Sequence, residues 1–305
     1  MEKTLTYSQA IELAGKSHIR PPLKNVRGVP LKEPIAKNFE SVWDFCPDPT
    51  DILIATYPKA GTTWTQEIVD LLLHNGDTEA CKRSSIVVRS PFLEISNPSP
   101  IPSGLDLLCK MSPPRIIKTH LPIQLVPEGF WENKCKVIYV ARNAKDSLVS
   151  YYHFDRMNVT QCEPGSWENY IQKFMKGELS WGSWYDHVNG YWRERENRNI
   201  LYLFYEDMKE NLQREVERIK QHLDLSVTDD VIAHIAEKTS FEVMKENPMV
   251  NYTFRPFLDQ SISPFMRKGE VGDWVNHFSA SQLEIFDEHY EQQMKMSNIP
   301  FRTNL

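Results

Sequence analysis

Short apolar runs alternate along the chain with segments in which apolar residues recur every three or four positions. Runs rich in β-branched residues at 52–54, 116–117, 136–140 and 199–204 predict buried strands. Helical spacing predicts helices after the first, third and fourth runs, and a last helix near 280–296. Strands that alternate with helices are typical of βαβ units. We therefore expect an α/β fold with a doubly wound, mostly parallel sheet in a single domain.

Three segments depart from this alternation. Residues 1–34 contain several prolines and predict irregular structure, followed by one short amphipathic helix around 35–43. Residues 77–113 and 245–273 lack clear periodicity and predict long loops, which in compact domains are often functional. The second loop contains the cationic turn Arg267-Lys268-Gly269.

The stretch 51–64 places a turn of small residues between a predicted strand and a predicted helix, in a P-loop-like arrangement. Pro58 ends the strand because proline cannot donate to a sheet ladder, and the helix begins near Thr62. Free N–H groups and the dipole at a helix N-terminus favour an anion, and Lys59 adds a positive charge. The stretch is not a Walker A loop, because Lys59 precedes Gly61 instead of following the last glycine. For the small-residue turn alone, an ordinary β-to-α turn remains the alternative.

Each predicted strand ends in polar groups: Lys59, Lys118 with His120, Arg142, and Tyr205. Ligands of doubly wound sheets bind beyond the carboxyl ends of the strands, so these groups would converge on one cationic edge. Lys118 and His120 have the same parity in an extended chain and would face the same way. A solvated strand end is the alternative for each residue alone, but the four stretches together favour a shared site.

Composition and charge narrow the class of protein. The chain has 305 residues, 41% of them hydrophobic, and a net charge of −6, which is an ordinary globular composition that disfavours a general nucleic-acid binder. The N-terminus lacks the apolar core of a signal peptide, and no apolar run is long enough to span a bilayer. Five widely spaced cysteines predict reduced thiols without zinc spacing. We expect a cytoplasmic protein with neither nucleic-acid nor membrane partners.

More cations would gather at this edge than one phosphate requires. Lys59 and the N–H groups of its loop suit one anion. Arg142 and the turn 267–269 suit a second anion, because arginine binds phosphate bidentately. An aromatic base would fit between two aromatic side chains, Trp64 and Phe241. The predicted ligand is a nucleotide with phosphates at two positions.

The elements that hold magnesium in phosphotransferases are missing from the sequence. No Walker Ser/Thr directly follows Lys59, and no predicted strand ends in a clear Walker-B aspartate. Phosphoryl transfer normally requires magnesium, whereas a less charged group such as sulfuryl could be transferred with lysines alone. We therefore predict no metal.

Several separate motifs together resemble those of cytosolic sulfotransferases. The sequence Tyr-Pro-Lys-Ala-Gly-Thr-Thr-Trp at 57–64 is similar to their 5′-phosphosulfate loop, and Lys-Thr-His at 118–120 resembles their catalytic strand end. The 3′-phosphate segment and the remaining nucleotide-site elements are matched at 139–146, 150–154, 204–208, 239–241 and 265–269. The similarity covers about residues 28–305 and is greatest to the phenol and small-amine subfamily.

The resemblance implies one sulfotransferase domain over residues 1–305, with 3′-phosphoadenosine 5′-phosphosulfate as donor and adenosine 3′,5′-bisphosphate as product. It implies sulfate conjugation of a small, phenolic acceptor, as in xenobiotic metabolism. His120 would be the general base, and Lys59 and Lys118 would assist catalysis. The implied nucleotide site comprises Lys59, Ala60, Gly61, Thr62, Thr63, Trp64, Arg142, Ser150, Tyr205, Thr239, Ser240, Phe241, Met244, Phe265, Met266, Arg267, Lys268 and Gly269. The implied acceptor site comprises Lys118, Thr119, His120 and three aromatic residues with core packing as the alternative, Phe92, Phe154 and Tyr252.

Two other functions remain open at this point. A P-loop-type phosphotransferase would bind ATP and need magnesium. A non-catalytic nucleotide-binding module would need neither Lys118 nor His120, so their presence at the predicted strand end argues against it.

Two expectations concern motion and assembly. Residues 245–270 would form a mobile cover that orders with nucleotide, on the reasoning that its charges lack a partner in the empty site. The stretch 275–284 aligns with the dimerisation motif of the family and keeps Glu284, but Val275 stands where the motif has lysine. We therefore expect a monomer or a weak homodimer.

Overall fold

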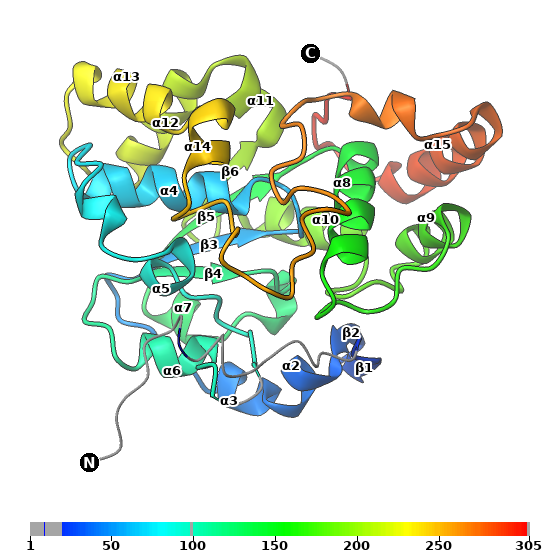
Figure 1. The fold of residues 1–305 in the computed structure, drawn as a ribbon, viewed down its shortest axis with the longest axis horizontal. Coiled ribbons are helices and arrows are strands. Elements are labelled where there is room, and N and C mark those ends of the chain that lie inside the picture. The colour runs from blue at the N-terminus through cyan, green and yellow to red at the C-terminus, as the bar shows by residue number, and fades with distance from the viewer. Residues whose placement is uncertain (1–8, 10–19, 98–99, 304–305) are drawn as a thin grey trace.

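The structure is a computed structural model that describes residue 9, residues 20–97 and residues 100–303. Its centre is a four-stranded sheet in the order β4-β3-β5-β6 (Figure 1). The strands are β3 (Ile52–Thr56), β4 (Ile116–Thr119), β5 (Lys136–Ala141) and β6 (Ile200–Phe204). All three strand pairs are parallel, and Ile54 lies opposite both Lys118 and Ile138. The predicted strands and the α/β class are confirmed.

Both faces of the sheet are buried, because successive side chains of a strand point to opposite sides. On β3, Leu53 and Ala55 join one apolar core, whereas Ile52 and Ile54 join another. The first core contains side chains of α8 (Ala144–Met157), α9 (Trp167–Met175) and α10 (Trp184–Glu194). The second contains side chains of α4 (Thr62–Leu73), α12 (Leu212–His222) and α13 (Asp229–Lys238). This is the doubly wound arrangement that the sequence predicts.

The N-terminal part differs from the prediction. Residues 20–34 are not irregular throughout, because β1 (Leu23–Val26) and β2 (Val29–Lys32) form an antiparallel hairpin. The two residues of its turn, Arg27 and Gly28, both have positive φ, which suits the twist of a tight hairpin. The predicted helix at 35–43 is two short helices, α2 (Glu33–Lys37) and α3 (Phe39–Trp43). Residues 1–8 and 10–19 of the predicted irregular segment lie outside the described residues.

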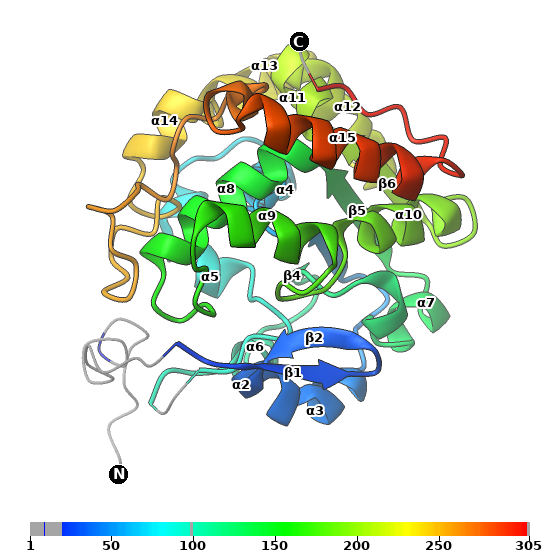
Figure 2. The same ribbon diagram turned by 90° about the vertical axis from the view of Figure 1, so that its right-hand side faces the viewer.

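The remaining elements are short, apart from the last helix. The predicted loop 77–113 contains η1 (Ala80–Lys82), α5 (Ile86–Arg89) and α6 (Gly104–Leu108). The connection from β4 to β5 contains η2 (Ile123–Leu125) and α7 (Gly129–Glu132), and α11 (Tyr205–Glu210) follows β6 directly. Then come α14 (Phe241–Glu246), η3 (Asp273–Asn276) and α15 (Ala280–Met294), which packs beside α9 (Figure 2). Residues 247–272, all of them described, form neither a helix nor a regular strand, as predicted.

The order of the strands places the site. The chain passes from β3 to β4 on one side and then crosses to β5 on the other side of β3. Such a switch point opens a crevice at the carboxyl ends of the strands, and the turn 57–61 lies there. Within the described part of the chain, no helix is both long and apolar enough to cross a bilayer.

Candidate active site

The turn after β3 has the conformation of an anion-binding loop. Lys59 and Gly61 have positive φ values of 70° and 103°, and α4 begins at Thr62. A Cβ atom at Gly61 would lie 3.0 Å from the ring of Tyr205, so both the backbone angle and the close approach favour glycine. Ala60 is fully buried, and its N–H donates to the carbonyl of Tyr57. The predicted strand–loop–helix is therefore present, with its N-terminal N–H groups at the edge of the sheet.

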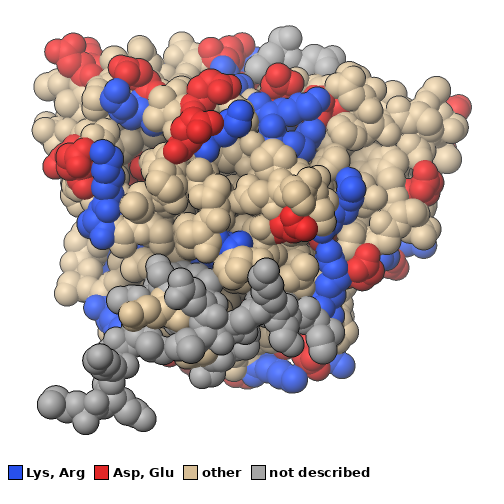
Figure 3. Space-filling model, viewed as in Figure 1, with Lys and Arg blue, Asp and Glu red and all other residues tan. Residues whose placement is uncertain are grey.

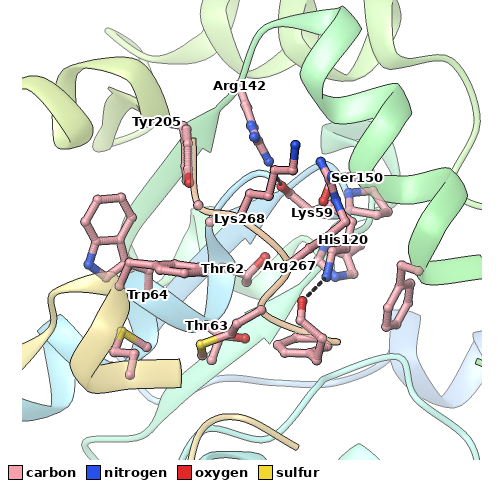
Figure 4. Close-up of a pocket in the computed structure, with 18 of the residues that line it drawn as sticks. Lys59, Thr62, Thr63, Trp64, His120, Arg142, Ser150, Tyr205, Arg267 and Lys268 are labelled. Atoms are coloured by element: carbon pink, nitrogen blue, oxygen red, sulfur yellow. Dashed lines mark hydrogen bonds between the residues drawn. The ribbon is translucent and has the colours of Figure 1, made fainter. Parts of the chain in front are cut away.

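A cavity of about 200 Å³ lies at this edge and brings together side chains from distant parts of the sequence (Figure 4). Acidic and basic side chains are interspersed on the surface seen in Figure 3, so the cations of the cavity are not part of a broad basic face there. The predicted residues that line the cavity are Lys59, Gly61, Thr62, Thr63, Trp64, Phe92, Lys118, His120, Arg142, Ser150, Phe154, Tyr205, Thr239, Phe241, Met244, Phe265, Met266, Arg267, Lys268 and Gly269.

Four predicted site residues do not line this cavity. Ala60 and Thr119 are buried beneath it, and Ser240 is the N-cap residue of α14. Tyr252 lines a second, adjoining cavity. The sequence interpretation also missed five residues of the lining, which are Pro58, Gln161, Trp181, Lys209 and Glu270.

Two lysines of the cavity are held among aromatic rings. The Nζ atom of Lys59 lies 4.0 Å from the centre of the Phe265 ring and 4.6 Å from that of Phe154. Burial, together with the charges of Lys118 and Arg142, lowers the pKa of Lys59 to about 7. Lys118 lies 4.4 Å over the Phe92 ring, and burial lowers its pKa to about 8. An anion bound here would relieve the repulsion among these cations.

Arg142 and the turn around Gly269 form the other cationic side of the cavity. Arg142 donates to the carbonyls of Lys59 and Glu270 at 3.3 and 2.9 Å and lies 4.3 Å over the Tyr205 ring. Its buried Nε has no hydrogen-bond partner within the described part of the chain, and neither has that of Arg267. Such orphaned donors fit an anionic ligand with more than one acceptor oxygen.

The cationic turn already has a counter-charge in this structure, although one carboxylate is shared by two cations. Arg267 and Lys268 form ion pairs with Asp273 at 2.6 and 2.5 Å. The expectation that these charges lack a partner in the empty site is therefore wrong. Although burial raises the pKa of Asp273, hydrogen bonds from Lys268, Asn276 and Arg267 bring it well below its usual value.

The hydrogen bonds of His120 fix its tautomer. Its Nδ1 lies 2.8 Å from the carbonyl oxygen of Thr56, which can only accept, so Nδ1 carries the proton and Nε2 keeps its lone pair. Its backbone N–H donates to Glu94 at 2.7 Å, and its carbonyl accepts from His187 at 3.0 Å. Burial and the charge of Lys118 hold the pKa of His120 well below 6.5. A neutral imidazole therefore lines the cavity at neutral pH.

The buried carboxylate of Glu94 organises the end of β4. It accepts hydrogen bonds from the hydroxyl of Thr119 at 2.9 Å and the indole N–H of Trp181 at 3.0 Å, besides that from His120. Burial raises the pKa of Glu94 to about 7. Phe92 and Trp181 flank the imidazole, with ring centres 4.9 and 5.2 Å from it.

Comparison with known proteins identifies the family. Residues 49–298 match the model of the sulfotransferase domain. The chain is 50% identical to sulfotransferase 1B1 of Canis lupus familiaris, over 96% of this chain and 100% of that one. It is 52% identical to sulfotransferase 1C2 of Rattus norvegicus, over 92% of this chain and 95% of that one. The chain belongs to the sulfotransferase family.

Solved structures agree with this assignment. Retinol dehydratase in complex with androsterone and the inactive cofactor PAP superposes with a TM-score of 0.82, at 25% identity, over 92% of each chain. Mouse sulfotransferase SULT7A1, complexed with PAP, gives a TM-score of 0.74 at 29% identity over 91% of this chain and 95% of that one. The protein is a sulfotransferase enzyme that uses 3′-phosphoadenosine 5′-phosphosulfate (PAPS), of which PAP, adenosine 3′,5′-bisphosphate, is the product.

Proposed function

We propose that this sulfotransferase acts on the hydroxyl or amine of a small, phenolic acceptor, with His120 as its general base. The observation that carries the proposal is the neutral Nε2 of His120, in a cavity that Lys59 and Lys118 also line. A base and two cations are thereby available to one reacting group. Membership in the family favours this chemistry over a phosphotransferase or a non-catalytic nucleotide module.

The residues present fit the nucleotide that the family uses. The donor, when bound, supplies the sulfuryl group. Lys59, with the hydroxyls and N–H groups of Thr62 and Thr63, would hold its 5′ end. Arg142, Ser150 and the turn 267–269 would hold its 3′-phosphate, which gives the orphaned guanidinium nitrogens acceptors. The adenine would lie among three aromatic side chains, Trp64, Tyr205 and Phe241.

The role of His120 follows from the acidity of the acceptor. A phenol has a pKa of about 10 and is mostly protonated at neutral pH. Nε2 of His120 would take this proton as the acceptor oxygen attacks sulfur. Lys118 and Lys59 would stabilise the negative charge on the sulfuryl oxygens. A placed base of this kind contributes about 10²–10⁴-fold to turnover.

The acceptor would bind in the second cavity, of about 110 Å³. This cavity shares Phe92, Lys118, Phe154, Gln161 and Phe265 with the nucleotide cavity, so the two are continuous at the end of β4. Tyr252, Phe257 and Phe265 add further aromatic side chains to its wall. We further infer that the whole chain is one sulfotransferase domain, located in the cytoplasm.

Nucleotide selectivity tests the assignment of the two phosphate sites. Adenosine 3′,5′-bisphosphate should raise the melting temperature much more than adenosine 5′-monophosphate, since a ligand of the folded state stabilises it. Arg142→Gln should abolish most of this difference. The shift should be the same with and without a metal chelator, whereas a magnesium-dependent phosphotransferase would respond to ATP and the chelator. Equal shifts for both adenosine nucleotides would remove Arg142 from the 3′-phosphate site.

A further inference from the structure

Three basic side chains lie in the wall of the acceptor cavity. Lys32, Lys118 and Arg255 line it, and no acidic residue is among the described residues of its lining. The uncharged polar residues of the same wall are Ser90, Asn97, Asn158, Thr160 and Gln161. In a protein of net charge −6, such a wall is not a consequence of overall composition.

Lys32 is the last residue of β2, and its position is unusual for a lysine. The residue is 4% exposed, and its Nζ donates to the carbonyl of Thr160 at 3.4 Å. It also faces the Trp181 ring at 5.4 Å and forms no ion pair within the described part of the chain. A buried ammonium has three donors and usually pairs with a carboxylate. The ammonium group of Lys32 can therefore still bind an anionic group of a ligand.

The two buried carboxylates near Lys32 accept hydrogen bonds from other groups, although Oδ1 of Asp155 has no hydrogen-bond partner within the described residues. Glu94 accepts hydrogen bonds from His120, Thr119 and Trp181. Asp155 accepts from the hydroxyl of Tyr170 at 2.7 Å. Neither carboxylate lines the cavity, and burial raises the pKa of both to about 7. These carboxylates reduce the net positive charge around Lys32, but they do not lie in the acceptor cavity.

The three cations do not all serve the donor. Lys118 lines both cavities and is available to the sulfuryl group, whereas Lys32 and Arg255 line only the acceptor cavity. Burial lowers the pKa of Lys118, and the charge of Arg255 lowers it further. Burial likewise lowers the pKa of Lys32, to about 8, and Lys118 contributes to the lowering. A positive charge on the acceptor would add to the repulsion among these cations, and a negative charge on the acceptor would relieve it.

We infer that the preferred acceptor is itself anionic: a phenol whose carboxylate, remote from the reacting hydroxyl, binds to Lys32. This inference rests on the proposed function and names the substrate class of the same site. The aromatic side chains Phe92, Phe154 and Tyr252 would contact the phenol ring, and Nε2 of His120 would take the hydroxyl proton.

Three acceptors that share a 4-hydroxyphenylethyl group and carry a negative, a neutral or a positive terminal group test the inference. They are 3-(4-hydroxyphenyl)propanoate, its methyl ester and 4-(2-aminoethyl)phenol, each assayed for kcat/KM with donor labelled in the sulfuryl group. For the wild-type enzyme, kcat/KM for the acid should exceed that for the ester by about tenfold or more, and the amine should be poorest. Lys32→Met, which keeps the length of the side chain, should lower kcat/KM for the acid by about tenfold and leave the ester within about threefold.

A matched control is Lys37→Met on α2, because Lys37 is 70% exposed and pairs only with Glu33 at the surface of the described structure. It should leave all three values unchanged, and the melting-temperature shift with the bisphosphate verifies that both variants fold. A wild-type enzyme that prefers the ester or the amine would overturn the inference while leaving the proposed function intact. Equal losses for acid and ester in Lys32→Met would also overturn it. Absence of labelled product from all three acceptors would contradict the proposed function as well.

Discussion

The Nδ1 atom of His120 donates a hydrogen bond to the backbone carbonyl of Thr56, across the gap between neighbouring strands β4 and β3. This 2.8 Å hydrogen bond holds His120 against the last residue of β3, the strand that leads into the anion-binding loop. Thr56 lies six residues before Thr62. Thr56 also bonds the hydroxyl of Thr62 through its own side chain, at 2.7 Å. The base and the loop are therefore positioned by the same residue.

The pH profile of kcat/KM should reflect this environment. Burial and the charge of Lys118 lower the pKa of His120, so the imidazole stays neutral to a lower pH than an exposed histidine. Activity that needs the neutral form is lost only as pH falls through the lowered pKa. We expect the acidic limb of kcat/KM for a phenolic acceptor to have its midpoint below pH 6.5. A midpoint at or above that value would show that His120 is protonated more easily than its surroundings indicate.

Gly269 should be required for nucleotide binding. Its φ is +66°, and a Cβ atom would lie 2.2 Å from Cδ2 of the Phe241 ring. Gly269→Ala should therefore displace this ring or the cationic turn, and weaken binding of adenosine 3′,5′-bisphosphate by about tenfold or more. Titration calorimetry measures the change.

A matched control for this substitution is Gly165→Ala. Gly165 has a similar φ of +74° but nothing within 4 Å of an added Cβ, so the backbone strain is shared and the clash is absent. Its affinity for the bisphosphate should stay near that of the wild type. Equal affinities for the two variants would show that the turn tolerates a side chain against Phe241.

The segment 247–272 should become better protected when nucleotide binds. Arg267 and Lys268 are paired with Asp273. When the nucleotide binds, its phosphate would therefore replace the carboxylate of Asp273 as their partner. Hydrogen exchange of this segment should slow on adding the bisphosphate. Asp273→Asn removes the competing carboxylate and should speed exchange in the free protein. Identical exchange with and without nucleotide would exclude a role as an ordering cover.

The sequence predicts those parts of the site that depend on local pattern. The apolar run before Pro58 predicts the end of β3, and the turn after it predicts the start of α4, each to within a few residues. Gln161 lies in the connection between α8 and α9, and Trp181 lies in the connection between α9 and α10. The places of both depend on contacts distant in sequence, such as the bond from Trp181 to Glu94. No local signal in the sequence identifies them.

A motif also identifies a segment without fixing which way each side chain points. Ala60 belongs to the loop motif, yet it is fully buried and its N–H bonds within the turn. The hairpin around Arg27 and Gly28 is not predicted from the sequence, because the neighbouring prolines disfavour regular structure.

The state of assembly should be monomer, or a dimer that dissociates at low micromolar concentration. Val275 stands where the dimerisation motif of the family has lysine, and it is 57% exposed. A small interface that loses such a contact weakens. Sedimentation should show Val275→Lys shifting the equilibrium toward dimer. A tight dimer of the wild-type protein would mean that another surface is used or that the substitution is tolerated.

The most direct test of the account is single-turnover transfer of labelled sulfuryl to a phenol by His120→Ala. We predict a loss of about 10²–10⁴-fold in the rate of the chemical step, because no other described residue of the cavity offers a neutral imidazole there. Binding of adenosine 3′,5′-bisphosphate should stay normal, because Lys59 and Arg142 are untouched. A rate within a few-fold of wild type would contradict the assignment of His120 as the base. Loss of bisphosphate binding would instead mean that His120 holds the loop through Thr56 and has no part in the chemistry.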